Sequence, residues 1–424
     1  MAAVFRLRRS SLGLWLAAAI AARAATPGPD LTFSVTEWAG VARANEIVRS
    51  GVPLPREARV FSVSQLTVMA DDGQAVPVCF HPLARWNAGR DNTNAPLQWV
   101  LLELPASVPA LGSRQYRLVV SDAPPAPVPF PAQVDLVKSG NEVRVNTGAA
   151  SFTLGGNANW LFDEVRLPDG TLVATGEPLS AMAESRQTQH AVLRRVVVER
   201  ASALAATVVV EGLYDLPPVG GGGLAARRRY QFSAGSATVL ISCQVVWEGA
   251  RFPVGVLAQN GVPNGLRLQQ VRAGLAVPWA GPRHVRIWGA AGSPPVEVAG
   301  LIGEAAWLEQ RLRARHTDPL CYELGWGANR QTGRAATGGL LAASDGGKTV
   351  AVALNRMHCY EPQALRLLAD GSMAVDIASD STWLGARQGL FANFGLCVAT
   401  GRQEAAALPA TLWARLNAPL RAWP

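Results

Sequence analysis

The sequence has almost no lysine, since Lys138 and Lys348 are the only two, and its many arginines do not gather in long runs. The longest basic run is Arg227-Arg228-Arg229. The formal net charge is +8, and about half of it lies in the first 24 residues. A chain without a basic stripe or a basic helix lacks the electrostatic footprint of a nucleic-acid-binding protein. We therefore expect no nucleic-acid partner.

Metal and nucleophile motifs are also missing. The five cysteines form no CxxC pair, the five histidines are far apart, and HExxH, GxSxG and EF-hand patterns are absent. These absences exclude zinc ribbons, zincins and nucleophile-elbow hydrolases, and we predict no metal and no cofactor. Asp376 and Asp380 could bind calcium, although Asp-rich turns are ordinary in β proteins. The cysteines are either free thiols or, in an oxidising compartment, form one or two disulfides.

What is present begins with an export signal. Arg8-Arg9 precedes an apolar stretch over 12–22, and Ala22-Arg23-Ala24 predicts cleavage before Ala25, so residues 1–24 are read as a signal peptide. The apolar stretch is shorter than the ~20 residues that a membrane-spanning helix needs. We expect contact with the membrane only during export, by the twin-arginine route, with ordinary secretion and an uncleaved anchor as alternatives. The expected location is periplasmic or extracellular.

The rest of the chain has the pattern of an all-β protein. Short β-branched and apolar runs recur, and Asp-Gly sequences between them predict hairpins. The predicted strands include 31–36, 60–63, 99–102, 116–120, 143–145, 150–154, 192–199, 206–211 and 239–247. The predicted hairpin turns lie at 71–73, 169–170, 345–347 and 370–371.

Composition divides the mature chain into three parts. A first β domain spans 30–122, and 123–133 is a connector with five prolines, which cannot donate backbone hydrogen bonds. The range 134–400 predicts a large antiparallel β-sandwich. The range 401–424 predicts a short helical tail, because apolar residues recur there at steps of three and four, although Pro409 interrupts them.

Two polar and aromatic stretches are candidates for saccharide binding. In the first, Arg85 and Trp86 could hold a carboxylate and stack on a sugar ring, and the alternative is a structural role in the first domain. In the second, His316 and Trp326 lie in a glycine-bearing stretch that is typical of binding loops. A plain loop that closes a hairpin is the alternative there.

A third stretch suggests acid–base chemistry. Arg356, His358 and Tyr360 follow the apolar run 350–354, and their alternation would place all three on one face of a strand. His358 and Tyr360 could then act as general base and acid, while Arg356 neutralises a carboxylate. That set suits β-elimination from a uronic acid. The alternative is a structural strand end with local hydrogen bonds.

Several segments carry a resemblance to a known family. They are 35–43, 48–55, 72–73, 76–77, 83–86 and 98–102 in the first domain, and 360–365 in the second. These segments resemble the exo-rhamnogalacturonan lyase-like proteins. The resemblance implies an N-terminal RIFT-type β-barrel over 30–122, followed by a central β-sandwich over 134–400. It covers nearly all of the mature chain.

The resemblance implies a substrate class, the uronic-acid-containing backbone of pectin. In that family a C-terminal α/α-toroid follows the sandwich, and this sequence lacks a matching segment after Leu420. We therefore expect a polysaccharide or oligosaccharide partner, and a separate toroid-domain protein as a further partner. The chain is either a polysaccharide lyase or a non-catalytic carbohydrate-binding or scaffold protein. A truncated gene product without an independent role is the third reading.

Overall fold

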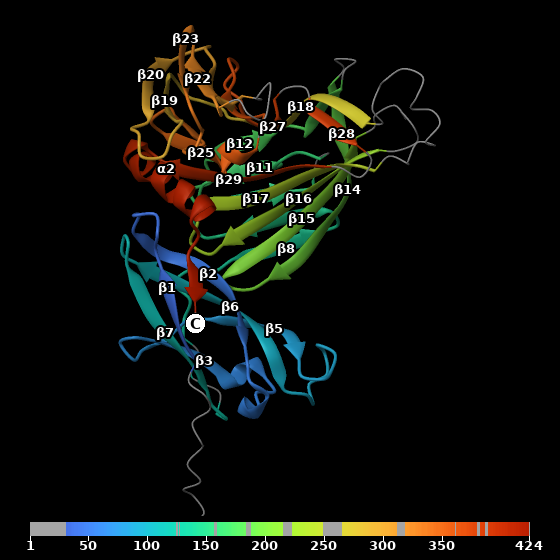
Figure 1. Ribbon diagram of the computed structural model, residues 1–424, viewed down its shortest axis with the longest axis vertical. Coiled ribbons are helices and arrows are strands. Elements are labelled where there is room, and N and C mark those ends of the chain that lie inside the picture. Colours follow the sequence, from blue (N-terminus) through green and yellow to red (C-terminus); the bar gives the residue numbers. More distant parts are fainter. Residues whose placement is uncertain are drawn as a thin grey trace, which may run out of the picture.

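The computed structural model describes residues 31–123, 126, 128–156, 159–183, 188–214, 223–248, 265–311, 319–360, 362–379, 382–385 and 389–423. These residues are mostly β-strand, and the α-helix described among them lies near the carboxyl end. The prediction of an all-β fold is confirmed (Figure 1). The predicted signal peptide lies outside the described residues. None of the described helices combines the length and apolarity that crossing a membrane requires.

The N-terminal unit consists of two antiparallel sheets that share one apolar core. The three-stranded sheet contains β2 (Arg43–Pro53), β6 (Leu97–Val108) and β5 (Cys79–Arg85). The five-stranded sheet contains β30 (Arg421–Trp423), β1 (Leu31–Thr36), β7 (Ser113–Val120), β3 (Leu66–Ala70) and β4 (Ala75–Val76). The hydrogen bonding of the described strands therefore forms two sheets here, and the RIFT-type barrel stays a prediction.

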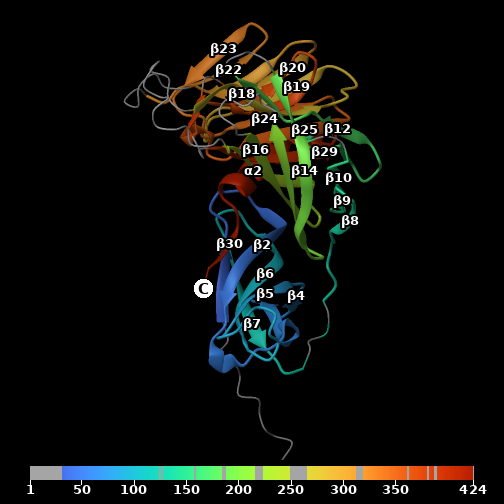
Figure 2. The ribbon, with the colours of Figure 1, turned by 90° about the vertical axis from the view of Figure 1, so that its right-hand side faces the viewer.

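The remaining strands form two large antiparallel sheets around a second apolar core. We call the first of them sheet I. In order, its strands are β14 (Thr188–Ala201), β15 (Ala205–Tyr214), β16 (Leu224–Ser233), β17 (Thr238–Trp247), β29 (Gly389–Thr400), β25 (Lys348–Leu354), β24 (Leu340–Ser344), β19 (Arg283–Trp288) and β20 (Val296–Leu301). Sheet I faces the N-terminal unit (Figure 2).

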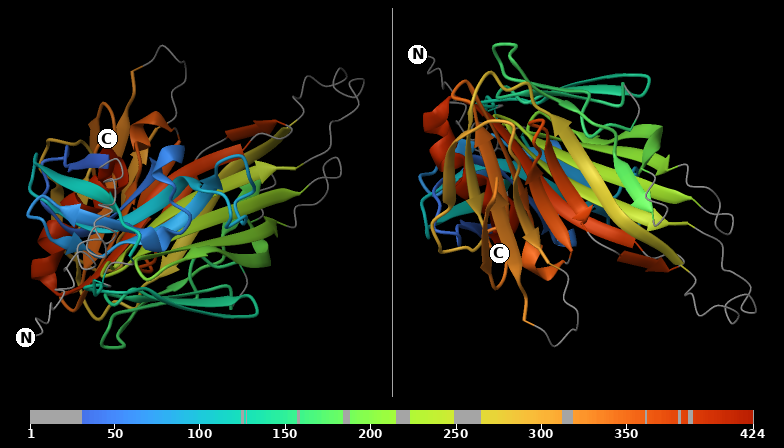
Figure 3. Two further views of the ribbon diagram at one scale, coloured as in Figure 1. Left: turned by 90° about the horizontal axis from the view of Figure 1, so that it is seen from below. Right: turned by 90° about the horizontal axis from the view of Figure 1, so that it is seen from above.

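The part of sheet II that contains β18 (Gly265–Ala276), β22 (Tyr322–Trp326) and β23 (Asn329–Gly333) lies on the far side of the core from the N-terminal unit (Figures 2 and 3). Along one run the strands of sheet II are β8 (Asp135–Ser139), β9 (Glu142–Asn146), β10 (Ser151–Leu154), β11 (Glu164–Arg166), β12 (Leu172–Gly176), β18 (Gly265–Ala276), β27 (Met373–Ala378), β26 (Gln363–Leu367), β21 (Ala306–Gln310), β22 (Tyr322–Trp326) and β23 (Asn329–Gly333). Two further strands, β13 (Ser180–Ala183) and β28 (Thr382–Gly385), also pair with β18. The two sheets are joined where β13 pairs with β14 of sheet I.

The local sequence explains most of these elements. All four predicted Asp-Gly turns close hairpins, and Gly73, Gly170, Gly346 and Gly371 adopt the positive φ that such turns require. One strand prediction is wrong. Residues 60–63 contain no strand, because the Ser62 side chain caps a 3₁₀ turn over Val63–Gln65 and Gln65 bonds back to Ser62.

The helix α2 (Arg402–Asn417) packs on the outer face of sheet I (Figure 1). Leu412, fully buried, and Leu416 contact apolar side chains of β24 and β25. The predicted helical tail is confirmed, and the helix continues through Pro409. After the helix, Leu420 enters the N-terminal core and β30 pairs with β1. The chain therefore returns to the unit in which it began.

Buried charges join the two units. Glu103 on β6 is fully buried and accepts a hydrogen bond from the Ser202 hydroxyl of sheet I at 2.7 Å. Arg49 on β2 lies 3.2 Å from Glu103 and donates to the Gln231 side chain at 3.0 Å and to the Phe232 carbonyl at 3.1 Å. Because these charges are paired at the junction, separating the units would expose or orphan them.

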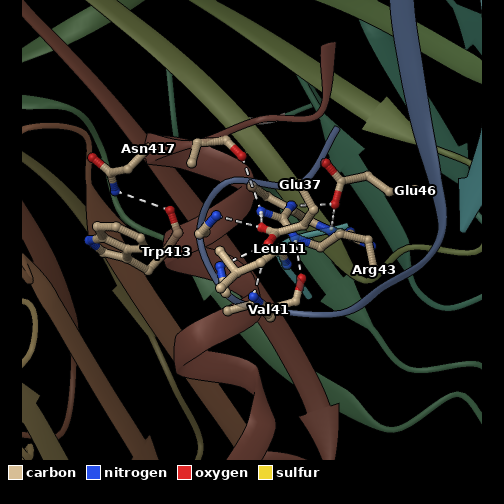
Figure 4. Close-up of polar contacts among 11 residues, drawn as sticks. Glu37, Val41, Arg43, Glu46, Leu111, Trp413 and Asn417 are labelled. Carbon is tan, nitrogen blue, oxygen red and sulfur yellow. Dashed lines mark hydrogen bonds and ion pairs between the residues drawn. The ribbon is translucent and has the colours of Figure 1, made fainter. Parts of the chain in front are cut away.

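A second buried carboxylate, Glu37, organises the end of the N-terminal unit that lies next to α2 (Figure 4). It accepts hydrogen bonds from four backbone N–H groups, at 2.8–3.2 Å, and from Arg43 at 3.0 Å. Arg43 also donates to the Ala418 carbonyl just after α2, at 3.0 Å, and pairs with Glu46 at 2.7 Å. This network links the first strands to the returning C-terminal segment.

All five cysteines are free thiols, so the disulfide alternative is wrong. Cys243 and Cys397 are buried, and burial raises the pKa of the Cys243 thiol to about 12. The described residues contain no group of three or more His, Cys, Asp and Glu side chains that could hold a metal ion.

Candidate functional site

Arg85 and Trp86 lie at the end of β5 in the N-terminal unit. Arg85 is 7% exposed, and its guanidinium donates to three backbone carbonyl oxygens at 2.6, 2.8 and 3.0 Å. The indole N–H of Trp86 donates to the Leu54 carbonyl at 3.1 Å. Both side chains hold loops of their own unit together. These contacts favour the structural alternative, and the saccharide-binding role of both residues stays a prediction.

Arg356, His358 and Tyr360 are not on a strand. β25 ends at Leu354, and Met357–Cys359 forms a 3₁₀ turn that follows a left-handed Arg356. The prediction that the three side chains share one face of a strand is wrong, because a 3₁₀ turn has about three residues per turn. Arg356 and Tyr360 are exposed and His358 is half-buried. The roles predicted for these three residues in catalysis stay predictions.

This turn leads into one end of sheet II. It runs into β26, whose first residue, Gln363, pairs with Gln310 at the end of β21. Gln310 also pairs with Tyr322, the first residue of β22. The backbone of Ser379, just after β27, donates to the Pro362 carbonyl at 3.2 Å. The second and third candidate stretches therefore meet at the same end of this sheet, which their positions in the sequence did not reveal.

The two remaining candidates lie at different places relative to that end. His316 lies outside the described residues. Trp326 is the last residue of β22, and its side chain packs against the core between the sheets. The indole therefore faces the core and not the outer face of the sheet, and its role in saccharide binding stays a prediction.

The outer face of sheet II, the face turned away from the core, carries the richest polar arrangement. Successive strand residues point to opposite faces. Leu308, Leu365 and Val375 face the core, so Glu309, Arg366 and Asp376 face outward. Strand register places these outward residues in two neighbouring rows across the sheet.

We call the first of these the charged row. It contains, in order across β22, β21, β26, β27 and β18, the residues Glu323, Glu309, Ala364, Asp376 and Arg272. The second, the aromatic row, runs beside it. It contains, in order across β23, β22, β21, β26, β27 and β18, the residues Arg330, Gly325, Trp307, Arg366, Ala374 and Gly274. Alanines and glycines thus separate the long side chains.

Asp376 is the centre of the charged row. It is fully buried, and its two carboxylate oxygens accept hydrogen bonds from Arg272 at 2.7 and 3.1 Å and from Arg366 at 2.5 Å. Arg366 also donates to Glu309 at 3.1 Å, and Glu309 accepts from the Ser379 hydroxyl at 2.9 Å. One connected ion-pair network therefore spans β18, β27, β26 and β21.

The charges of this network stabilise one another. Burial by itself lowers the pKa of Arg366, but the negative charges of Asp376 and Glu309 outweigh burial and raise the pKa above its ordinary value. Calcium binding by Asp376 is corrected, since its oxygens are taken up by guanidinium groups, whereas calcium sites gather several oxygen ligands around the ion. Asp380 lies outside the described residues.

Glu177, just after β12, adds a protonatable group to this face. A Cβ atom at Gly274, in the aromatic row, would lie 2.3 Å from the Glu177 carboxylate, so the glycine makes room for that side chain. Burial raises the pKa of Glu177, and so does the negative charge of Asp370. A hydrogen bond with Ser372 lowers the pKa, but the net shift is upward. A half-buried carboxyl group of raised pKa takes up a proton more readily than an ordinary glutamate.

Sequence reasoning missed most of this site. The network joins Arg272 to Asp376 and Glu309 to Arg366 across separations of 104 and 57 residues. The available signal was a charged residue at an alternating position inside an otherwise apolar strand, as in the β27 sequence MAVDIA. That pattern marks an outward-facing charge. It does not name the partner strand, because register between distant strands is a tertiary property.

No protein-family model matches the chain, and no curated protein matches it either. The structure is similar to an alpha-mannosidase from Enterococcus faecalis, with 12% identity and a TM-score of 0.53, over 92% of this chain and 45% of that chain. It is similar to a family 38 glycosyl hydrolase protein from Enterococcus faecalis, with 11% identity and a TM-score of 0.53, over 94% of this chain and 48% of that chain.

The chain thus spans less than half the length of these two solved structures. At such low identity the likeness shows the fold alone. This fold is shared with carbohydrate-active enzymes, namely glycoside hydrolases. Neither of these two solved structures is a rhamnogalacturonan lyase. The resemblance to that family therefore rests on the sequence segments alone.

Proposed function

We propose that this chain binds a uronic-acid-containing saccharide on the outer face of sheet II. The ion-pair network around Asp376 carries the proposal, because it sets Arg272 and Arg366 beside two carboxylates on an outward surface. The side chains of Arg272 and Arg366 are 21% and 22% exposed, so they keep surface for a ligand while Asp376 holds them in place. A ligand site needs such fixed polar groups.

The chemistry of a uronic acid fits these groups. Guanidinium groups bind carboxylates through paired hydrogen bonds, and protein carboxylates accept hydrogen bonds from sugar hydroxyls. The alanines between the long side chains are buried, so the charged groups themselves form the surface that a sugar would meet. The fold shared with glycoside hydrolases supports a saccharide ligand by analogy.

The finer substrate class follows from the sequence resemblance. The exo-rhamnogalacturonan lyase-like proteins act on the pectin backbone, and we propose rhamnogalacturonan or a related uronic-acid polymer as the ligand. We also propose that the chain is exported through its amino-terminal signal, to the periplasm or beyond, where such polymers occur.

The binding proposal is tested by calorimetric titration with tri-galacturonate and with rhamnogalacturonan oligosaccharides. Arg272→Gln should weaken binding about tenfold or more, because a hydrogen bond to a charged group contributes about 1.5–3 kcal/mol. Arg286→Gln is the matched control. Its side chain is 23% exposed and pairs with Glu297 at 3.1 Å, but it lies on sheet I. Equal losses in both variants, or no binding by the native chain, would contradict the proposal.

A lyase is the second candidate function. It is favoured by the position of the turn that holds His358 and Tyr360, which leads into the end of sheet II next to Ser379, the hydroxyl donor to Glu309. For this reaction we propose a separate toroid-domain protein as partner, because the resembled family contains that domain.

The lyase reading predicts a rise in ultraviolet absorbance from unsaturated uronate when the chain is incubated with pectic polymers. His358→Ala and Tyr360→Phe should each slow that rise about 10²–10⁴-fold, the usual contribution of a general acid or base. Unchanged rates in both variants would show that these residues are not catalytic. Binding without any rise in absorbance at high protein concentration would leave a non-catalytic carbohydrate-binding protein.

A further inference from the structure

Trp307 occupies an unusual position on the outer face of sheet II. It lies directly across from Gly325 on one side and from Arg366 on the other. A Cβ atom at Gly325 would come within 2.3 and 2.6 Å of the six-membered ring of the indole. The indole therefore lies over bare glycine backbone. Trp326, the next residue after Gly325, packs instead against the core.

The neighbourhood of Trp307 carries more positive than negative charge. The guanidinium of Arg330 lies over the Trp307 ring, 5.7 Å from its centre, and the Arg330 side chain is 68% exposed. Glu323 is paired with two arginines, Arg311 at 3.1 Å and Arg330 at 3.6 Å. The Glu323 carboxylate is thus shared by two guanidinium groups. By contrast, Arg272 and Arg366 are paired with two carboxylates, those of Asp376 and Glu309.

We propose that Trp307, Gly325 and Arg330 form the subsite that recognises the uronic acid. The pyranose ring takes the place of the Arg330 guanidinium on the indole, and Arg330 pairs with the carboxylate of the same sugar. An aromatic ring offers a sugar a broad apolar surface, and an exposed arginine with a shared counter-charge offers a free hydrogen-bonding edge for an anion. This inference rests on the proposed function and assigns its specificity to one place.

The subsite explains a glycine that the fold itself does not require. Gly325 lies within β22, where glycine weakens a strand, and its φ is not among the positive values. A glycine in a strand interior often marks a close approach of another group. Here the approaching group is the indole, whose six-membered ring contacts the strand at Gly325.

Two ligands and three variants test the subsite. The ligands are tri-galacturonate and its fully methyl-esterified form, which has the same rings without the negative charges. Arg330→Gln should weaken binding of tri-galacturonate about tenfold and leave binding of the ester unchanged. Trp307→Ala should weaken binding of both ligands about 3–10-fold, because stacking does not depend on the charge. Gly325→Ala should resemble Trp307→Ala, since it displaces the indole.

Arg227→Gln is the control for Arg330→Gln. Arg227 is an exposed arginine that pairs with Glu199 at 3.2 Å on sheet I, and its substitution should change neither affinity. Circular dichroism checks that each variant folds, and Trp307→Phe gives a milder change if Gly325→Ala does not fold.

The outcomes separate this inference from the proposed function. If the native chain binds tri-galacturonate and Arg272→Gln weakens binding, while Trp307→Ala and Arg330→Gln do not, the subsite is wrong and the proposed function stands. If Arg330→Gln weakens binding of the ester as much as that of the acid, recognition of the carboxylate by Arg330 is wrong. If the native chain binds neither ligand, the proposed function fails and the subsite fails with it.

Discussion

Three carboxylates that are at most 1% exposed, Glu37, Glu103 and Asp376, define the chain at the scale of single residues. An isolated buried charge is costly, so each is surrounded by donors from segments far apart in the sequence. Glu37 links the turn after β1 to the segment that follows α2. Glu103 joins the two units, and Asp376 fixes Arg272 and Arg366 on sheet II. Each buried carboxylate thus marks a place where distant strands must meet.

Glu37 yields a prediction about pH. Burial raises its pKa, but hydrogen bonds from the backbone of Leu111 and Ala39 and from Arg43 outweigh burial and lower the pKa below the ordinary 4.5. A depressed folded-state pKa contributes stability that is present above the ordinary pKa and is lost as the pH falls through the folded-state value. Glu37→Gln should therefore cost about 3 kcal/mol at neutral pH, as expected for breaking a buried pair.

The measurement is the free energy of unfolding in urea from pH 7 down to pH 3, for the native chain and for Glu37→Gln. The difference between the two should shrink as the pH falls below about 4. Glu164→Gln, which removes an exposed pair with Arg166, should cost less than about 1 kcal/mol at every pH. A constant difference for Glu37→Gln across the whole range would contradict the assigned role.

At the scale of elements, α2 covers the part of sheet I formed by β24, β25 and β29. Leu412 is its fully buried contact, and a Cβ atom at Gly395 on β29 would come 2.6 Å from the leucine side chain. The glycine therefore lets the helix approach the sheet closely. Leu412→Ala should lower the free energy of unfolding by about 2–5 kcal/mol, the usual cost of a cavity at a core leucine.

Chemical denaturation tests this prediction. Ile302→Ala is the control, because Ile302 is 69% exposed and its loss should change stability by about 0.5 kcal/mol or less. A cost below about 1 kcal/mol for Leu412→Ala would mean that the helix contributes little to the fold.

Local signals made the elements predictable from the sequence. Asp-Gly turns and alternating strands depend on a few neighbouring residues, and all four predicted hairpins are present. The strand prediction failed at residues 60–63, because the Ser62 side chain caps a 3₁₀ turn there. The run Arg227-Arg228-Arg229 illustrates how successive strand residues point to opposite faces of a sheet. The outer two arginines pair with Glu199, while Arg228 points inward and donates to the Trp160 carbonyl.

The site was much less predictable than the elements. The sequence pointed to Arg85, Trp86 and Trp326, whose side chains bond to backbone carbonyls or pack against the core. Polar and aromatic clusters in a sequence do not show which face of a sheet they occupy. Trp307 and Arg366 drew no attention, although they lie side by side on β21 and β26. Only the pairing of distant strands brings them together.

At the scale of the whole molecule, the N-terminal unit contacts sheet I and leaves the outer face of sheet II on the opposite side (Figure 2). The units are tied by Glu103, by Arg49 and by the returning strand β30. A ligand on sheet II would therefore meet a surface that the junction does not use. The junction that holds the two units together is therefore separate from the face proposed to bind saccharide.

The most direct test of that separation is the titration of tri-galacturonate into the native chain, Arg272→Gln and Arg286→Gln. The account predicts that affinity falls about tenfold or more for the substitution on sheet II and stays unchanged for the matched substitution on sheet I. Equal affinity in all three chains, or a loss confined to Arg286→Gln, would contradict it.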